Sequence, residues 1–352
     1  MSTPPSRLGK RGQPTIYDVA RLAGVSTATV SRSLNGTGQI APSTQLAIES
    51  AIRELGYQPN RVARSLVTRS TQTIALLLPD ITNPFYGALV SGIEQRTLEL
   101  GYTILLCTTE DDPAREETYL DLLRSKQVDG ALVDGLLLPA DRLARFVAEG
   151  FPIVCLDRDS PSPSVPLVQV DNRLGARLAT GHLTALGHRR IAHVTGRPEM
   201  RISQERIEGY RESLESAGLE YEPDLVVSGA FSEDGGFEAG LRLFARDPAP
   251  TAVFAANDLS AVGLLEAVAE SGRQVPDDVS VVGFDDLRLA SYTTPPLTTV
   301  RQPAREIGER ATTLLLDMTR GKRPRKLRHL LEPQLVVRRS TAAPPRKGRR
   351  RL

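Results

Sequence analysis

The 352-residue chain has little of what exported, membrane-spanning or disulfide-bonded proteins contain. Its two cysteines, Cys107 and Cys155, lie in apolar runs without metal-ligand spacing, so we expect buried free thiols in a reducing cytoplasm rather than a disulfide. The N-terminus, MSTPPSRLGKRG, has no apolar signal core, and no apolar run approaches the length of a membrane span. We therefore expect a soluble, intracellular protein.

Signs of catalysis are also missing. The sequence contains neither a nucleophile elbow nor a phosphate-binding glycine motif, and its four histidines form no metal-binding pair at helical spacing: His182, His188, His193 and His329. We expect no enzymatic activity, no cofactor and no metal site. His182 and His188 border a predicted helix end, where capping or a surface position is the ordinary explanation.

Charge is divided unevenly along the chain, although the net charge is only +2. Residues 1–71 carry +6 and residues 338–352 carry +7, which leaves −11 on residues 72–337. A basic head on an acidic body concentrates the attraction for phosphates in one module. With 40% hydrophobic residues, the chain has enough apolar material for two or three domains.

Residues 15–56 predict two short helices joined by a glycine turn, followed by a third helix. Thr15 and Asp18 form a helix-start signature, Gly24 can end the first helix, and Ser26 can cap the second. A third helix is predicted over Ser43–Leu55. The bland alternative is a three-helix bundle that binds nothing, but the helix lengths and cap spacing favour a helix-turn-helix that reads the DNA major groove.

From residue 73 onward, short apolar runs alternate with helical patterns, which predicts parallel sheets covered by helices. More than ten such strands rarely form one sheet, so we expect two lobes. A late strand near Leu297–Arg301 and a helix near Arg305–Met318 could return to the first sheet. The predicted strands and helices are Ile74–Leu78, Phe85–Leu100, Thr103–Cys107, Asp112–Leu123, Ala131–Val133, Arg142–Val147, Ile153–Leu156, Ile191–Val194, Gln204–Ala217, Leu225–Val227, Gly236–Phe244, Ala252–Phe254, Leu259–Ala269 and Val279–Gly283.

Polar residues follow several predicted strands: Asp80, Asp157-Arg158, Asn257-Asp258 and Asp285-Asp286. Each one alone is more often a helix cap or a turn residue. Because ligands of open α/β sheets bind beyond the carboxyl ends of the strands, their recurrence across two lobes favours a ligand cleft.

Taken together, these features resemble the lactose/galactose-repressor (LacI) family of bacterial transcription regulators, from Thr15 to Arg339. The most specific motifs are Asp18-Val19-Ala20, Ala23-Gly24-Val25-Ser26, Thr29-Val30-Ser31-Arg32, Leu34-Asn35-Gly36, Leu55-Gly56-Tyr57, Pro59-Asn60 and Ala63-Arg64-Ser65-Leu66. Later matches include Asn83-Pro84-Phe85, Leu186-Gly187-His188, Ala256-Asn257-Asp258 and Gly283-Phe284-Asp285. The resemblance implies an α/β core of two lobes, similar to periplasmic sugar-binding proteins, behind a small all-α helix-turn-helix domain.

We expect the chain to divide into a basic arm (1–13), the helix-turn-helix domain (14–59), a hinge helix and linker (60–71), the two-lobed core (72–340) and a basic disordered tail (341–352). The resemblance implies the three middle parts, whereas composition and charge predict the arm and the tail. It also implies a DNA-binding surface. Thr27, Ala28 and Arg32 would meet base edges, although a phosphate contact is an equal alternative for Arg32. The remaining predicted DNA-binding residues are Thr15, Ser26, Thr29 and Ser31 as phosphate anchors, with Asn35, Asn60, Ala63, Arg64 and Leu66.

The segment Asn60–Val67 is too short to persist as a helix alone in water. By resemblance it would form a hinge helix on DNA, with Leu66 as a wedge in the minor groove. The alternative is a flexible linker with an incidental leucine. Val67 stands where relatives often have a basic residue, so a phosphate contact is in doubt there.

For the effector, the resemblance implies that Arg206 and Asp285 grip vicinal hydroxyls between the lobes. The remaining predicted effector-binding residues are Asn257, Asp157, Phe85 and Phe231. An interlobe salt bridge is the alternative for Arg206 and Asp285. Because Met200 and Ile202 stand where relatives often have polar contacts, the effector's identity is open. We expect the effector to be a sugar or a sugar phosphate, with a nucleobase or nucleoside as the second candidate.

One helix-turn-helix contacts only half of an operator, so we expect a homodimer on a roughly palindromic operator. A dimer is favoured over a tetramer, because no heptad-patterned helix follows the core. Two other classes of protein are disfavoured. A solute-binding protein would need an export signal, and a sugar-modifying enzyme would need a set of catalytic residues, and the sequence shows neither. The tail, Arg346-Lys347 and Arg349-Arg350-Arg351, either adds nonspecific DNA affinity through counterion release or, as is more common for charged termini, has no measurable role.

Overall fold

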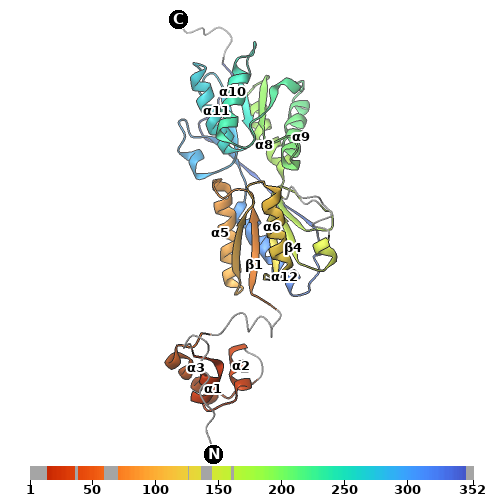
Figure 1. The fold of residues 1–352 in the computed structure, drawn as a ribbon. Coiled ribbons are helices and arrows are strands. Elements are labelled where there is room, and N and C mark those ends of the chain that lie inside the picture. The colour runs from red at the N-terminus through yellow and green to blue at the C-terminus, as the bar shows by residue number, and fades with distance from the viewer. Residues whose placement is uncertain are drawn as a thin grey trace, which may run out of the picture. The chain divides into compact units, whose positions relative to one another are not determined.

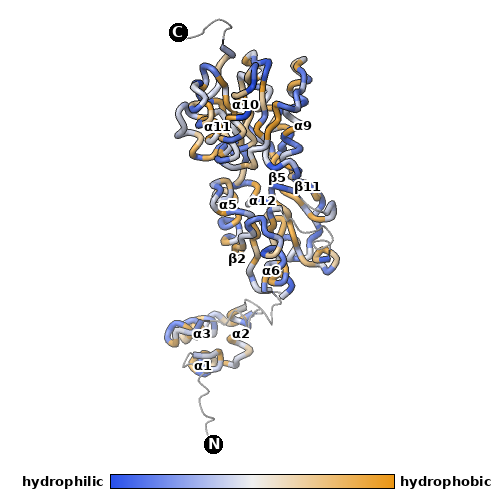
Figure 2. The backbone as a smooth tube through the Cα atoms, turned by 45° about the horizontal axis from the view of Figure 1, so that its top comes forward, coloured by the Kyte–Doolittle hydropathy of each residue, from blue (hydrophilic) through white to orange (hydrophobic). Residues whose placement is uncertain are grey.

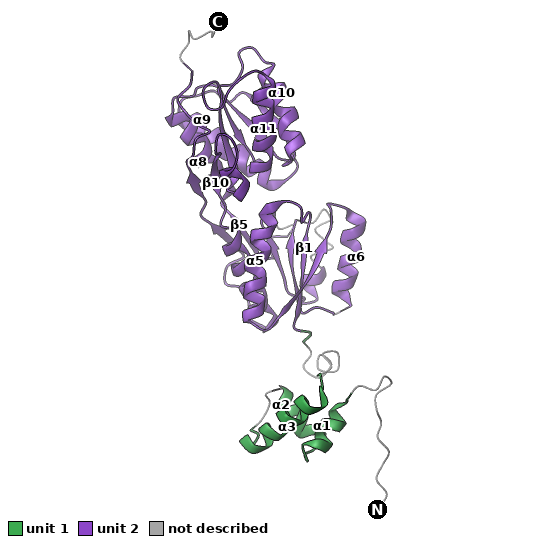
Figure 3. Cartoon of the chain, turned by 90° about the vertical axis from the view of Figure 1, so that its left-hand side faces the viewer, with its two compact units in different colours: residues 1–71 green, residues 72–352 purple. Residues whose placement is uncertain are grey.

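The computed structural model describes residues 14–35, 39–58, 70–125, 127–135, 145–159 and 162–345, except the side chain of Asn35. The chain divides into two compact units, residues 1–71 and 72–352 (Figure 3). The predicted arm, the hinge segment 59–69 and the tail from residue 346 lie outside the described residues, as does the first half of the predicted helix Arg142–Val147; its second half is helical, as predicted.

Three helices make up the described part of the first unit: α1 (Ile16–Leu22), α2 (Thr27–Asn35) and α3 (Pro42–Leu55). The Asp18 carboxylate accepts hydrogen bonds from the Thr15 amide at 2.9 Å and the Thr15 hydroxyl at 2.7 Å, which fixes the start of α1. Gly24, at φ +67°, makes the turn into α2. The small core of this unit consists of Val19, Ala20, Val30, Ile48 and Ala51.

The second unit contains two six-stranded sheets, as the strand count predicts (Figure 1). Sheet 1 is parallel, in the order β11-β5-β4-β3-β1-β2. Its strands are β1 (Thr73–Leu78), β2 (Thr103–Thr108), β3 (Gly130–Asp134), β4 (Ile153–Leu156), β5 (Leu167–Val170) and β11 (Arg328–Leu331). Helices α5 (Pro84–Glu99), α6 (Pro113–Arg124) and α12 (Ala304–Thr319) belong to the first lobe, as do the helical residues 145–148.

Sheet 2 has the order β12-β10-β9-β8-β6-β7, and only β12 among these described strands is antiparallel to its neighbour. Its strands are β6 (Ile191–Thr195), β7 (Val226–Ser228), β8 (Ala252–Ala255), β9 (Ser280–Asp285), β10 (Thr298–Arg301) and β12 (Gln334–Val336). Helices α8 (Asn172–Ala185), α9 (Arg201–Ser216), α10 (Glu233–Phe244) and α11 (Asp258–Glu270) form the second lobe, with short 3-10 turns at Pro223–Leu225 and Arg288–Ser291.

The chain crosses between the lobes three times, after β5, β10 and β11. This corrects one prediction: the late strand β10 pairs with β9 in sheet 2 and does not return to sheet 1. The helix that follows it, α12, does return and packs on β3, β4 and α5. Gly92 and Gly308 permit the contact between α5 and α12, because a Cβ on either would collide with backbone of the other helix. The strands β5, β11 and β12 were not predicted, and of the helix α8 only its end near His182 and His188 was.

Apolar stretches alternate with polar ones along the backbone of both lobes (Figure 2), as sheets covered by helices require. Cys107 and Cys155 are both buried thiols, as predicted. Within the described residues, no helix is both long and apolar enough to cross a membrane.

The packed chain continues past residue 340, where the sequence placed the end of the core. The Ala342 carbonyl accepts a hydrogen bond from His188 Nε2 at 2.9 Å, and the Ala342 amide donates to the Ser280 hydroxyl at 3.0 Å. His188 also contacts the Thr251 hydroxyl at 2.9 Å and is only 2% exposed. The expectation of a capping or surface role is therefore wrong for His188, which is a buried anchor for the C-terminal segment.

Candidate functional site

The helix-turn-helix exposes one side of α2. Its apolar side is buried through Val30, whereas Ala28 and Arg32, one turn apart, are exposed. Thr27 is half-buried beside them at the helix start. A base-reading contact requires these residues to be accessible, so the geometry is compatible with the predicted roles.

The predicted phosphate anchors lie near the starts of α1 and α2. The Ser26 hydroxyl accepts a hydrogen bond from the Thr29 amide at 3.1 Å, so Ser26 caps α2, and it also pairs with the Thr29 hydroxyl at 2.8 Å. Thr15 and Ser31 are partly exposed. The side chain of Asn35 and all of Asn60, Ala63, Arg64 and Leu66 lie outside the described residues.

In the second unit, one small cavity brings together all six residues predicted to contact an effector. Its volume is about 50 Å³. Phe85 and Asp157 come from the first lobe and the other four from the second, so the cavity lies between the lobes. The lining consists of Phe85, Asp157, Arg206, Phe231, Asn257 and Asp285, with Asn83, Tyr86, Arg158, Ile202 and Gln302.

Several of these side chains sit on unusual backbone. Asp157, Phe231 and Asp285 have φ values of 46°, 62° and 117°, in the region that favours glycine. Such conformations persist only where the surrounding structure enforces them, and they cluster at binding sites. Gly196 helps to place Phe231, because a Cβ there would collide with the phenyl ring.

Arg206 is the buried cation of the cavity, at 2% exposure. Its Nε donates to Asn172 Oδ1 at 3.0 Å, its Nη1 donates to the Ala256 carbonyl, and its guanidinium lies 3.8 Å from the centre of the Phe284 ring. The sequence left open a salt bridge between Arg206 and Asp285 that would join the two lobes. Such a pair cannot join them, because α9 carries Arg206, β9 carries Asp285, and both elements belong to the second lobe.

Three buried carboxylates surround the two cations of the lining. Burial is the main cause that raises the pKa of Asp157 to about 7 and that of Asp285 to about 6, and Arg206 opposes it in both cases. Burial also raises the pKa of Asp134, whose Oδ1 accepts from the Arg158 amide at 3.2 Å. A carboxyl group whose pKa lies near 7 can change its protonation state when a ligand binds.

Asn257 combines two roles. Its Oδ1 accepts from the Ser260 amide at 2.9 Å as the cap of α11, and its Nδ2 donates to the Phe231 carbonyl at 3.0 Å. Asn257 therefore both caps a helix and lines the cavity.

Gln302 is a cavity residue that the sequence analysis did not identify. It follows β10 directly and donates from Nε2 to Asp285 Oδ1 at 2.6 Å. Its place after a strand was the available signal.

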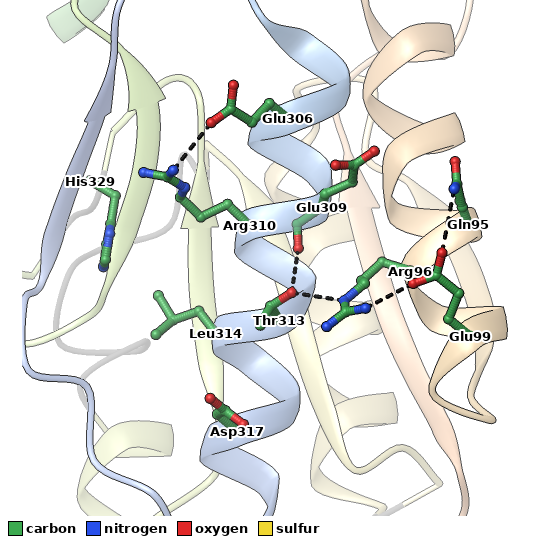
Figure 4. Close-up of a pocket in the computed structure, with 10 residues that line it drawn as sticks. All are labelled: Gln95, Arg96, Glu99, Glu306, Glu309, Arg310, Thr313, Leu314, Asp317 and His329. Carbon is green, nitrogen blue, oxygen red and sulfur yellow. Dashed lines mark hydrogen bonds and ion pairs between the residues drawn. The ribbon is translucent and has the colours of Figure 1, made fainter.

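A larger groove lies elsewhere on the first lobe, across α5, α12 and β11 (Figure 4). Its volume is about 680 Å³, and both arginines of its lining form ion pairs within it, Arg96 with Glu99 and Arg310 with Glu306. None of the predicted site residues lines it. Among the described residues, no cluster of three metal-ligating side chains was found.

Comparison with known proteins matches both parts of the chain. Residues 15–60 match the family model "Bacterial regulatory proteins, lacI family", and residues 180–341 match "Periplasmic binding protein-like domain". The HTH-type transcriptional regulator DegA of Bacillus subtilis (strain 168) is 40% identical over 331 residues, which cover 93% of this chain and 98% of DegA.

Two solved structures extend the match. The CelR–cellobiose complex is 39% identical, with a TM-score of 0.72, over 93% of this chain and 100% of that one. The Lac repressor dimer bound to operator and the anti-inducer ONPF is 30% identical, with a TM-score of 0.84, over 94% and 100%. With its helix-turn-helix and its two parallel-sheet lobes, the chain belongs to the LacI family of bacterial transcriptional regulators.

Proposed function

We propose that the chain is a homodimeric, effector-controlled repressor that binds a pseudo-palindromic operator and has no catalytic activity. The observation that carries the proposal is the interlobe cavity, in which all six predicted effector residues meet. A ligand in that position contacts both lobes at once, so its binding energy can favour one lobe arrangement over another. In such systems the coupling between sites is about 1–3 kcal/mol.

The effector is a sugar or a sugar derivative. The lining supplies carboxylate, amide and guanidinium groups for hydroxyls, and Phe85 and Phe231 for the apolar faces of a ring. The related CelR was solved with cellobiose, which supports this class. A nucleobase or nucleoside is the competing class, because the same aromatic side chains could stack on a base.

The dimer would cover the edge of sheet 1. The edge strand β2 leaves Leu105 at 36% and Leu106 at 44% exposure, and Leu98 of the neighbouring α5 is 66% exposed. An uncovered apolar edge strand invites pairing with another chain, and a second copy of this chain would remove it from water. The dimer of the related Lac repressor on its operator supports a dimer here. We propose that it acts in the cytoplasm, where operator DNA is available.

The proposal is tested by measuring operator affinity with and without ligands. An operator is first selected from random duplexes with the full-length chain, and fluorescence anisotropy then follows binding across sugars and nucleosides. We expect one sugar to change the operator affinity by about 5- to 150-fold. Asp285→Asn should bind operator normally but lose the response, whereas Asp224→Asn, an exposed control at 85% side-chain exposure, should keep it. Failure to select any operator would contradict the proposal.

A further inference from the structure

Two buried hydrogen-bond acceptors in the wall of the interlobe cavity have no donor within the part of the chain that the structure describes. Asp157 Oδ1 and Gln302 Oε1 are buried and have no hydrogen-bond partner among the described residues. Both residues line the cavity, at 5% and 6% exposure. A buried acceptor without a donor is costly, so a ligand that brings donors to these two atoms gains free energy on binding.

The charges of both lining cations already face carboxylates. Arg158 Nη1 donates to Asp111 Oδ1 at 2.8 Å, and the Arg158 charge also faces Asp134. Arg206 donates to Asn172 and the Ala256 carbonyl, and its charge faces both Asp157 and Asp285. Because Arg197 also pairs with Asp111, four carboxylates surround three cations, so acidic groups still outnumber basic ones.

We propose that the effector is an uncharged polyhydroxyl compound, a free sugar, and that the cavity rejects phosphorylated or carboxylated sugars. This inference rests on the proposed function. Hydroxyls can donate to Asp157 Oδ1 and Gln302 Oε1 and can also accept from a guanidinium, whereas a phosphate dianion has no hydrogen to donate to either acceptor. A phosphate would also add about −1.5 to −2 charges to a site with an excess of carboxylates.

Admission of a sugar requires the lobes to separate. The volume of about 50 Å³ is far below the roughly 300–1,000 Å³ of small-molecule sites. Charge discrimination does not depend on this opening, because Arg158 and Asp157 are adjacent in the first lobe, and Arg206 and Asp285 both belong to the second.

The test compares matched pairs on the full-length chain by calorimetry and thermal shift. The pairs are ribose and ribose 5-phosphate, glucose and glucose 6-phosphate, glucose and gluconate, and cellobiose and cellobionate, with adenosine as the nucleoside arm. We expect at least one neutral sugar to bind, and its anionic counterpart to bind about 100-fold more weakly or not at all. The inference is overturned if no neutral sugar binds more tightly than its anionic counterpart and than adenosine.

Two variants add a second readout. At pH 8, above the raised pKa of Asp157, Asp157→Asn should weaken binding of the neutral sugar by about 10- to 100-fold, because an amide oxygen replaces a charged acceptor, while Asp224→Asn should not. An unchanged affinity in Asp157→Asn counts against the inference. If only a sugar phosphate alters operator affinity, the inference fails while the proposed function stands, and if no ligand of any class alters it, both fail.

Discussion

Arg197 Nη1 lies 3.0 Å from Asp111 Oδ2, and this ion pair joins the second lobe to the first. The other oxygen of the same carboxylate is 2.8 Å from Arg158 Nη1. Because Arg158 lines the interlobe cavity, the cavity wall is connected to the opposite lobe through one side chain. Asp111 is held at φ 52° and its side chain is 14% exposed, so its position is well defined.

This pair should stabilise the closed arrangement of the lobes. We expect a double-mutant cycle with Asp111→Asn and Arg197→Gln, followed by thermal unfolding, to give a coupling of about 0.5–1 kcal/mol, after allowance for screening at the exposed arginine. The helix pair Arg211–Glu215 is a matched control, because both side chains are more than half exposed. A coupling no larger than in the control would show that the interlobe pair does not hold the lobes together.

Protonation of Asp157 should make stability depend on pH. Its pKa is raised to about 7 in the folded chain, against about 3.9 for an unfolded aspartate, so the folded state binds more protons between these values. The free energy of unfolding of the natural chain, relative to Asp157→Asn, should therefore fall as the pH rises from 5 to 7 and then level off.

Urea unfolding at pH 5, 6, 7 and 8 measures this difference. His188 and His193, whose pKa values burial lowers, have the opposite effect, since the unfolded state takes up protons as the pH falls. They act in both proteins and cancel in the difference. A difference that is constant from pH 5 to 8 would mean that Asp157 titrates as an ordinary exposed acid.

Two truncations should separate the C-terminal anchor from the basic tail. Ending the chain after Ser340 removes the Ala342 contacts to His188 and Ser280, and we expect a loss of about 1–3 kcal/mol in the stability of the second unit. Ending it after Pro345 keeps these contacts and should leave the melting temperature unchanged. Equal melting temperatures for both truncations would refute the anchoring role.

The role of Arg32 can be decided by a conservative change. Arg32→Lys keeps a positive charge but loses the bidentate geometry that reads guanine. If Arg32 reads a base, the change should lower operator affinity by about 1–3 kcal/mol and leave nonspecific binding nearly intact. Equal small losses on operator and nonspecific DNA would instead assign Arg32 to a phosphate contact.

Leu66→Ala tests the hinge wedge, which lies outside the described residues. We expect weaker operator binding, because the apolar wedge would no longer stabilise the bent site, with effector affinity unchanged. Gel-shift titration beside Val67→Ala, its neighbour, gives the comparison. Unchanged operator affinity in Leu66→Ala would exclude the wedge.

The sequence by itself determined the features that depend on neighbouring residues. Thr15 and Asp18 cap a helix three residues apart, Gly24 makes a turn by its own conformation, and the alternation of strands and helices follows from periodicity. The polar residues Asp157 and Asp285 could be selected because every parallel strand ends at the same edge of its sheet.

Only the tertiary structure decided the contacts between residues far apart in the chain. It paired β10 with β9, buried His188 against Ala342, brought Gln302 into the cavity and joined Asp111 to Arg197 across the lobes. Arg206 could be identified as a cavity residue from the resemblance to the LacI family, but its contact with the Phe284 ring is visible only in the folded structure. The residues of each pair are 15 or more positions apart in the sequence. Neither the spacing of residues nor their helix and strand propensities specify which distant groups meet when the chain crosses three times between two lobes.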